Sequence, residues 1–266
     1  MISSPSLLAS TARRSILEMT SRANASHVGS CLSVVDILSV LYAGVGDFST
    51  GERDQESKDK LILSKGHAAA ALYSVLAIQG FIPQEWIDEY CQNGAQLGGH
   101  ITSKGIPAIE LSTGSLGHGL PYGVGIALGK KLLGDNGRCF VVMSDGECDE
   151  GTTWESALLA NHHNLNNLCV IIDRNRLQSL TSTEETLRLE PFAQKWSSFG
   201  WEVRDVDGHN YDEITEALTV SESPICVIAN TVKGKGVSFM ENSVLWHYRP
   251  PNSEELNAAL AEVTGA

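Results

Sequence analysis

Two polar side chains that could bind a metal together follow apolar stretches of this sequence. Asp145 and Gly146 come directly after the stretch 139–144, and Asn175 stands thirty positions after Asp145, behind a second stretch at 168–173. Open parallel sheets bind ligands at the carboxyl ends of their strands. We therefore expect Asp145 and Asn175 to lie side by side there, where a carboxylate, an amide oxygen and a backbone carbonyl suit Mg²⁺. An Asp at a strand end can also be purely structural, and the pair alone leaves both interpretations open.

Short apolar runs predict the strands that must position these residues. Each run is rich in Val, Ile and Leu and apolar on both faces, which is typical of buried parallel strands. The predicted strands are Lys60–Ser64, Cys139–Ser144, Leu168–Asp173 and Ile225–Asn230. Helical segments are expected between them at 68–79, 153–164 and 211–222. This alternation predicts an α/β fold, with a parallel sheet and helices on both of its faces.

The remaining segments predict further helices and two long loops. Helices are expected at 7–22 and at 34–43, the second with a capping-box-like start at Ser33. A third, at 116–133, is rich in glycine, which costs about 1 kcal/mol each inside a helix and therefore suggests close packing against a cofactor, a partner chain or the sheet. The irregular stretches 44–59 and 93–114 are long enough to be functional. Without a linker or repeat, residues 1–266 are interpreted as one domain.

Composition excludes several classes of protein. With 42% hydrophobic residues the chain is globular rather than disordered. It carries 19 Lys and Arg against 32 Asp and Glu, a net charge of −13, which argues against nucleic-acid and membrane-surface partners. No uninterrupted apolar run approaches the ~18 residues of a membrane helix. Six scattered cysteines without a CxxC indicate neither a disulfide framework nor a zinc site, and they favour reduced thiols in the cytoplasm.

Several motifs, taken in order, resemble the diphosphate-binding part of transketolases, which are thiamine-diphosphate enzymes. An acid–Gly pair followed about thirty residues later by Asn is the signature of these enzymes, and here it reads SDGECDEG … DRN, with Ser144 where Gly is usual. The resemblance covers most of residues 7–250. Its other motifs are HVG at 27–29, LSKGH at 63–67, GGH at 98–100, STGSLGHG at 112–119, DGH at 207–209, TVKGKG at 231–236 and WH at 246–247.

The resemblance implies roles for individual residues. The divalent metal, Mg²⁺ or else Ca²⁺ or Mn²⁺, would be held by Asp145, Asn175 and the carbonyl of Leu177. Thiamine diphosphate would be bound by His67, Gly114, Leu116, Gly146, Glu147, Asn175 and His247. Catalytic roles fall to His27, His100 and His247, around the sugar's carbonyl and first hydroxyls, and to Glu150 at a subunit contact.

For each of these residues a structural interpretation also exists. A single histidine could be a satisfied, partly buried side chain, and Glu150 could be a helix-terminal acid. His118 stands where many transketolases carry Gln, and His209 is expected in a structural turn. Lys233 and Lys235 could contact phosphate or belong to a solvated loop. No close ligand spacing supports a zinc site built from histidines.

The resemblance also implies a missing half. In this family a second domain binds the aminopyrimidine ring and supplies an activating glutamate, and this chain ends before it. We therefore expect one subunit of a split transketolase, which pairs with a separate pyrimidine-domain subunit in an α2β2 assembly. Together they would move a two-carbon ketol unit from a ketose, as a sugar phosphate, to an aldose.

Two alternatives remain from the sequence. The metal signature is shared by the α chains of 2-oxo acid dehydrogenases and by deoxyxylulose-phosphate synthases, although His27, His100 and His247 favour transketolase. The other alternative is a non-catalytic module that binds thiamine diphosphate or a nucleotide. A nucleotide is disfavoured, because the sequence has no GxGxxG after a strand and no P-loop.

Overall fold

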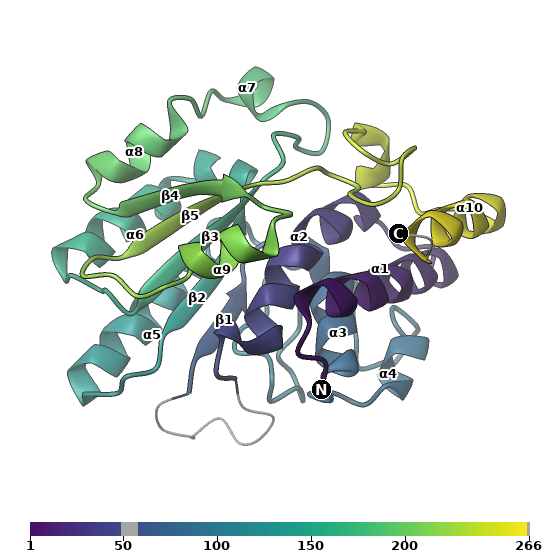
Figure 1. The fold of residues 1–266 in the computed structure, drawn as a ribbon, viewed down its shortest axis with the longest axis horizontal. Helices are drawn as coiled ribbons and strands as arrows, with labels where there is room; N and C mark the ends of the chain where they lie inside the picture. Colours follow the sequence, from purple (N-terminus) through teal and green to yellow (C-terminus); the bar gives the residue numbers. More distant parts are fainter. Residues whose placement is uncertain (49–57, 265–266) are drawn as a thin grey trace.

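A five-stranded, wholly parallel sheet organises the chain (Figure 1). The computed structural model describes residues 1–48 and 58–264. Within them the strand order is β1-β2-β3-β5-β4. The strands are β1 (Lys60–Leu63), β2 (Cys139–Ser144), β3 (Leu168–Arg174), β4 (Glu202–Asp207) and β5 (Ile225–Asn230). The four predicted strands are confirmed, with ends that differ by at most one residue, and the parallel pairing is confirmed with them.

Strand β4, at one edge of the sheet, was not predicted from the sequence. It pairs only with β5 and is partly exposed along its length. Its sequence, EVRDVD, mixes charged residues with two valines. An edge strand leaves one side and part of its faces in water, so it needs no continuous apolar run.

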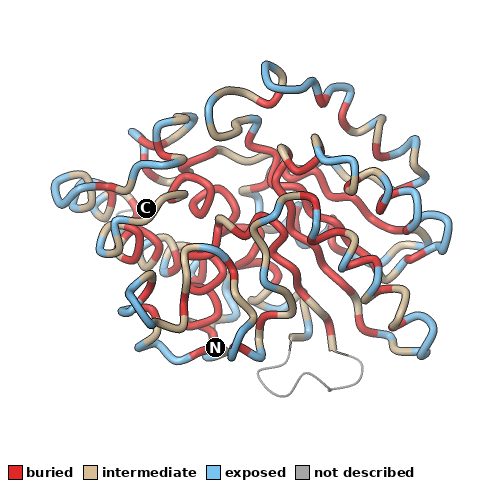
Figure 2. Tube along the Cα trace, turned by 180° about the vertical axis from the view of Figure 1, so that it is seen from behind, coloured by how far each residue is buried: buried red, intermediate tan, exposed pale blue. Residues whose placement is uncertain are grey.

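Apolar side chains fill both faces of the sheet. Successive residues of a strand point to opposite faces. Accordingly, Val142 belongs to one buried apolar cluster while its neighbours Val141 and Met143 belong to another. The first cluster is covered by α1, α2, α3, α9 and α10, and the second by α5, α6 and α8. Figure 2 shows the buried strands at the centre and exposed backbone at the periphery. Helices on both faces are therefore confirmed.

The six predicted helices are present with shifted ends, and α4, α7, α8 and α10 were not predicted. On the first face lie α1 (Pro5–Arg22), α2 (Val28–Val40), α3 (Ala69–Ile78), the short α4 (Glu85–Asp88), α9 (Tyr211–Ala217) and α10 (Ser253–Thr264). On the second lie α5 (Gly119–Leu133), α6 (Gly151–His162) and α8 (Phe192–Ser198), with α7 (Thr183–Thr186) in a loop nearby. Helix α9 ends well before the predicted residue 222, because Leu218 already leaves the helical backbone.

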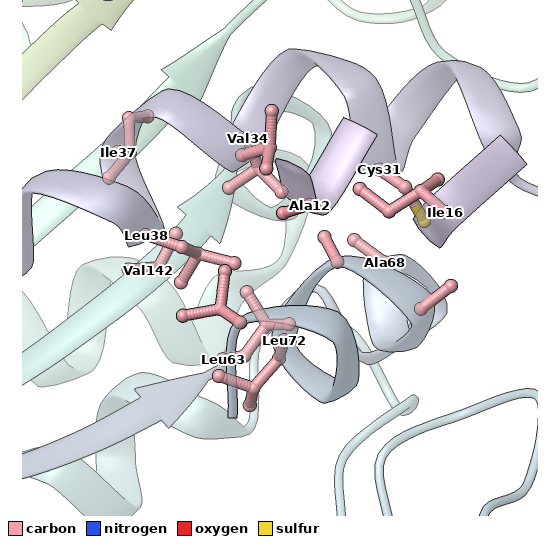
Figure 3. Close-up of a cluster of buried hydrophobic side chains, with 14 of the residues drawn as sticks. Ala12, Ile16, Cys31, Val34, Ile37, Leu38, Leu63, Ala68, Leu72 and Val142 are labelled. Atoms are coloured by element: carbon pink, nitrogen blue, oxygen red, sulfur yellow. The ribbon is translucent and has the colours of Figure 1, made fainter. Parts of the chain in front are cut away.

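Helix α2 starts six residues earlier than predicted, and the expected cap at Ser33 is wrong. Ser33 lies inside the helix, where its hydroxyl donates to Asp173 at 2.6 Å. Figure 3 shows α2 packed against α1, α3 and the ends of β1 and β2. The stretch Val28–Val45 has the length and composition of a membrane span, and 78% of it is buried inside the fold. Its central position in the core accounts for that composition.

The irregular and glycine-rich regions also take defined places. Residues 93–114 contain turns and loops, as predicted, whereas residues 49–57 of the other long stretch lie outside the described residues. The glycine-rich helix α5 begins at Gly119. A Cβ on Gly119 or Gly123 would collide with Ser64 or Val141, while Gly125 and Gly129 face open space. Tight packing against the sheet therefore explains only the first two of these glycines.

Candidate active site

A cavity of about 250 Å³ opens where the strands end. Its lining comes from the loops after β1, β2, β3 and β5, from the start of α2 and from the segment before α5. Ten of the predicted site residues meet there although they span most of the chain. They are His27, His67, His100, Gly114, Leu116, Asp145, Gly146, Asn175, Leu177 and His247.

Asp145 and Asn175 lie at the ends of neighbouring strands, as predicted. Strands β2 and β3 pair in register up to Ser144 and Asp173. The carboxylate of Asp145 accepts the backbone N–H of Arg176 at 2.6 Å and that of Gly146 at 2.8 Å. The side-chain oxygen of Asn175 accepts the N–H of Leu177 at 3.1 Å. These backbone bonds fix both side chains at the cavity wall.

The donor set fits a hard divalent cation. Burial raises the pKa of Asp145, and the nearby Arg174 guanidinium, at 3.3 Å, offsets only part of that effect. A metal ion would add positive charge that compensates the burial of this carboxylate. The Asp145 carboxylate, the Asn175 amide and the Leu177 carbonyl are oxygen donors of the kind that Mg²⁺ prefers. Among the described residues no cluster of three His, Cys, Asp or Glu side chains offers an alternative metal site.

Four histidines surround the cavity mouth. The ring centre of His27 lies 5.2 Å from His67, 5.5 Å from His100 and 5.1 Å from His247. Burial, together with the neighbouring histidines and lysines, lowers the pKa of His27 to about 4 and that of His247 to about 3. Burial likewise lowers the pKa of His67 far below its ordinary value. Near pH 7 these three rings are therefore neutral, and each can both donate and accept a hydrogen bond.

The backbone of His27 has a strained conformation with a positive φ angle. It precedes α2 with φ +76°, in the left-handed region that residues other than glycine adopt uncommonly. Its N–H donates to the carbonyl of His247 at 2.7 Å. Strained backbone of this type is concentrated at binding and active sites. The bond ties together two of the four histidines that lie far apart in the sequence.

A buried ion pair that the sequence interpretation missed underlies the cavity. Lys65 pairs with Asp173, and both side chains are almost fully buried. Burial alone would raise the pKa of Asp173, but Lys65 and the hydroxyls of Ser33 and Thr231 outweigh it, so the pKa is lowered. The signal was present, since Lys65 lies inside the LSKGH motif directly after a strand. Its partner is 108 residues away and only the fold identifies it.

The sequence left open whether Lys233 and Lys235 contact phosphate or belong to a solvated loop, and the two lysines differ in this respect. Lys233 is buried in the cavity wall, where its ammonium donates to the carbonyls of Leu177 at 3.3 Å and Gln178 at 3.2 Å. Burial, with a contribution from Lys65, lowers its pKa to about 8. Lys235 is instead half-exposed and faces Glu241. Lys233 is therefore part of the site, and Lys235 is not.

Two predicted acids lie outside the cavity lining. Glu147 is buried and accepts from the hydroxyl of Ser64, the N–H of Gly117 at 3.1 Å and the N–H of Ser144 at 2.8 Å. It thereby holds the loops that carry the lining residues. Glu150 is exposed immediately before α6. Its expected place at a subunit contact stays a prediction.

The arginines and the exposed histidine near the site have structural bonds. Arg174 is buried and contacts Asp145, Thr183 and Glu190. Arg176 supplies a backbone N–H to Asp145, while its side chain is exposed. His118 is exposed and its ring lies 3.0 Å from the Leu116 carbonyl. None of these three side chains lines the cavity.

Known proteins resemble the chain over nearly its whole length. A family described as "Transketolase, thiamine diphosphate binding domain" matches residues 5–263. An apulose-4-phosphate transketolase subunit of Phocaeicola vulgatus is 38% identical over 256 residues, which cover 95% of this chain and 91% of that protein. The 6-deoxy-6-sulfo-D-fructose transketolase subunit SqwG of Clostridium sp. (strain MSTE9) is 36% identical over 259 residues, covering 96% and 94%.

A solved structure shares the fold. The transketolase of Campylobacter jejuni superposes with a TM-score of 0.92 at 29% sequence identity. The match covers 98% of this chain but only 42% of the Campylobacter protein. The chain thus spans less than half the length of that enzyme, while it spans almost all of the relatives whose names include the word subunit.

Proposed function

The chain belongs to the transketolase family, and from that membership we propose that it is the diphosphate-binding subunit of a split transketolase. The enzyme transfers a two-carbon ketol unit from a ketose to an aldose and uses thiamine diphosphate with a divalent metal, Mg²⁺. The observation that carries this proposal is the cavity in which the Asp145–Asn175 oxygen pair faces a group of four histidines. A 2-oxo acid dehydrogenase subunit would not account for those histidines.

The cavity wall divides into two chemical halves. On the strand side, Asp145, Asn175 and the Leu177 carbonyl would hold the metal, which would supply positive charge against the cofactor's diphosphate. Lys65 and Lys233 bring two further positive charges to the same wall. His67, buried and neutral, donates to a phosphate oxygen without adding a charge. The backbone of Gly114 and Leu116 and the small Gly146 leave room for the cofactor beside these groups.

On the mouth side, the histidines handle the sugar. Thiamine diphosphate, when bound, would supply a nucleophilic carbon, which is chemistry that no side chain offers. His27, His100 and His247 bind the carbonyl and first hydroxyls. Because the rings of His27 and His247 are neutral near pH 7, they offer hydrogen bonds without adding charge, and Nδ1 of His247 lies 2.9 Å from the Lys233 ammonium.

A separate subunit carrying the pyrimidine-binding domain completes the site. Apolar side chains support this part of the proposal, since the outer faces of α5 and α6 expose large hydrophobic residues. They are Tyr122, Leu132, Leu133, Leu158 and Leu159. Outer helix faces normally carry charged residues, and an exposed apolar stripe marks a contact surface. The start of α5 adjoins the cavity, because it lies three residues after Leu116, whereas Leu132 and Leu133 lie at the far end of that helix. We assign the whole apolar face to the contact with the companion in an α2β2 assembly.

The names of the relatives narrow the substrate class. One acts on a sugar that carries a phosphate, and another on a sugar that carries a sulfo group. Both groups are anionic and lie at a distance from the ketol end. We accordingly assign a sugar phosphate as donor or acceptor. The six free thiols, all within the described residues, suit a reducing compartment, and we place the enzyme in the cytoplasm.

Ketol transfer measured with the two purified subunits tests the proposal. Transfer from a ketose phosphate to an aldose phosphate is expected only when this chain, its companion, thiamine diphosphate and Mg²⁺ are all present. Transfer by this chain alone would overturn the split arrangement. Decarboxylation of pyruvate in place of sugar transfer would assign the chain to the 2-oxo acid dehydrogenase class, and cofactor binding without either reaction would indicate a non-catalytic module.

A further inference from the structure

A second polar cluster lies beside the cavity without lining it. The carboxylate of Asp36 in α2 is buried and receives hydrogen bonds from three elements of the chain. Arg13 of α1 donates to it, Tyr211 of α9 donates at 2.9 Å, and His209 lies 2.7 Å from it. Burial alone would raise the pKa of Asp36, but the hydrogen bonds from His209 and Arg13 outweigh it, so the pKa is lowered. The carboxylate is therefore ionised and acts as an acceptor.

The two ring nitrogens of His209 face different partners. Nδ1 faces Asp36, whereas Nε2 accepts the backbone N–H of Val232 at 2.8 Å. An acceptor nitrogen carries no proton, so the proton of the neutral ring lies on Nδ1 and points to Asp36. His209 thus links the carboxylate to the main chain of the 231–233 segment. A turn residue in a purely local role would not need both nitrogens.

The 231–233 segment is held from two sides, and it carries Lys233 into the cavity. Thr231 donates its hydroxyl to Asp173 of the buried ion pair. Val232 donates to His209 on the other side. Lys233 follows directly, and its ammonium reaches the carbonyls of Leu177 and Gln178. A shift of this segment would move the ammonium away from the cavity wall.

We propose that His209 is a positioning residue, which fixes Lys233 in the cavity by bridging Asp36 and the backbone N–H of Val232. The bridge itself is a property of this chain. Its consequence for cofactor binding rests on the proposed function, in which Lys233 faces the diphosphate.

Two substitutions of His209 separate its two hydrogen bonds. In His209→Asn the amide nitrogen can take the place of Nδ1 and donate to Asp36, but nothing reaches Val232. In His209→Gln the longer side chain can place its oxygen near the position of Nε2 and accept from Val232. Tyr211→Phe is the matched control, because it removes a hydrogen bond from the same carboxylate without touching the 231–233 segment.

Hydrogen exchange of the Val232 amide in the full chain, without cofactor, tests the bridge directly. The amide should exchange about fivefold or more faster in His209→Asn than in wild type, as expected for loss of one hydrogen bond. Exchange in His209→Gln and Tyr211→Phe should stay within about twofold of wild type. Equal exchange in all four proteins would overturn the bridge, and so would equal acceleration in Asn, Gln and Phe variants, which would indicate general loosening.

Titration with thiamine diphosphate and Mg²⁺ tests the consequence. The affinity should fall about fivefold in His209→Asn and recover in His209→Gln, while all variants keep the same far-ultraviolet circular dichroism. Faster exchange with unchanged affinity would overturn the positioning role and leave the proposed function intact. If wild type itself failed to bind the cofactor in the presence of the companion subunit, the proposed function would fail, and the exchange result would still decide whether the bridge exists.

Discussion

The wall of the cavity and the outer face of α5 and α6 differ in burial and chemistry. The wall is buried and polar, and its charged groups find partners within the chain, as Lys65 does at Asp173 and Asp145 does at Arg174. The outer face is exposed and apolar. Leu132 is 79% exposed and Leu158 is 60% exposed, and the space beside Gly125 and Gly129 of α5 is open.

This difference indicates which part of the site the chain completes by itself. Buried polar groups without partners cost several kcal/mol, so a finished polar wall is a property of the folded single chain. Exposed leucines carry no comparable free-energy cost in a monomer, and they stabilise the protein only when another surface covers them. The polar wall is therefore complete in the single chain, and we expect a second chain to cover the apolar face.

The largest effect is expected from breaking the wall at its buried ion pair. Lys65→Met leaves the Asp173 carboxylate buried without its cation, which should lower the free energy of unfolding by about 3–5 kcal/mol. The matched exposed pair is Arg14–Glu18, with side chains 60% and 39% exposed. Arg14→Met should cost no more than about 0.5 kcal/mol. Urea denaturation measures both, and similar losses would contradict the claim that the wall is internally complete.

The next effect concerns the metal rather than the fold. Asp145→Asn removes the one carboxylate from the proposed donor set, and it should weaken binding of thiamine diphosphate with Mg²⁺ about 100-fold or more, measured by calorimetry. Asp149→Asn is the control, because Asp149 lies in the same loop and bonds Gln178 but does not line the cavity. It should change the affinity less than about threefold. Equal losses would mean that the loop, and not the Asp145 ligand, determines binding.

The third prediction tests the outer face. Leu158→Asp should leave the stability of the isolated chain within about 0.5 kcal/mol, since the side chain is exposed. It should nevertheless weaken assembly with the companion chain by about tenfold or more, because a charge would be buried in an apolar contact. Val220→Asp, at a residue that follows α9 and is 74% exposed, should change neither the stability nor the assembly. Sedimentation velocity of the mixed subunits decides, and unchanged assembly of Leu158→Asp would place the companion elsewhere.

The same contrast explains how much the sequence could reveal. Strands β1, β2, β3 and β5 were predictable because burial on both faces demands continuous apolar runs, and the order of strand, loop and helix then brings the motif residues to one edge. The edge strand β4 is partly exposed and therefore does not need a continuous apolar run. The early start of α2 was missed because Ser33 resembles a cap, and only the fold reveals that its hydroxyl reaches Asp173, 140 residues away.

Roles within a single motif were harder to separate. Asp145, Glu147 and Glu150 are acids of one short segment, and spacing alone does not distinguish them. In the fold, Asp145 lines the cavity, Glu147 turns inward to Ser64 and Gly117, and Glu150 faces outward. The turn at Asp145–Asp149 determines these directions through backbone geometry, which residue types alone do not specify.

The smallest effect is expected at the cavity mouth, where the wall meets solvent. Burial is the main cause that lowers the pKa of His27 to about 4 and of His247 to about 3 in the folded chain, against about 6.5 when unfolded. Between pH 6.5 and 4 the unfolded chain therefore binds protons that the folded chain does not, so stability falls as the pH is lowered through this window. The melting temperature of wild type should drop across it by several degrees.

The double variant His27→Asn, His247→Asn removes both of these proton sites, so its melting temperature should depend less steeply on pH over the same window. At about pH 7.5 neither the wild-type histidines nor the substituted asparagines carry a charge at these positions. A loss of ketol transfer there, with thiamine diphosphate binding retained, would place these rings on the sugar side of the cavity. An unchanged pH slope in the variant would show that the mouth histidines are already solvated like those of an unfolded chain. In that case the neutral rings, and the division of the cavity into an anion-binding wall and a neutral mouth, would have to be given up.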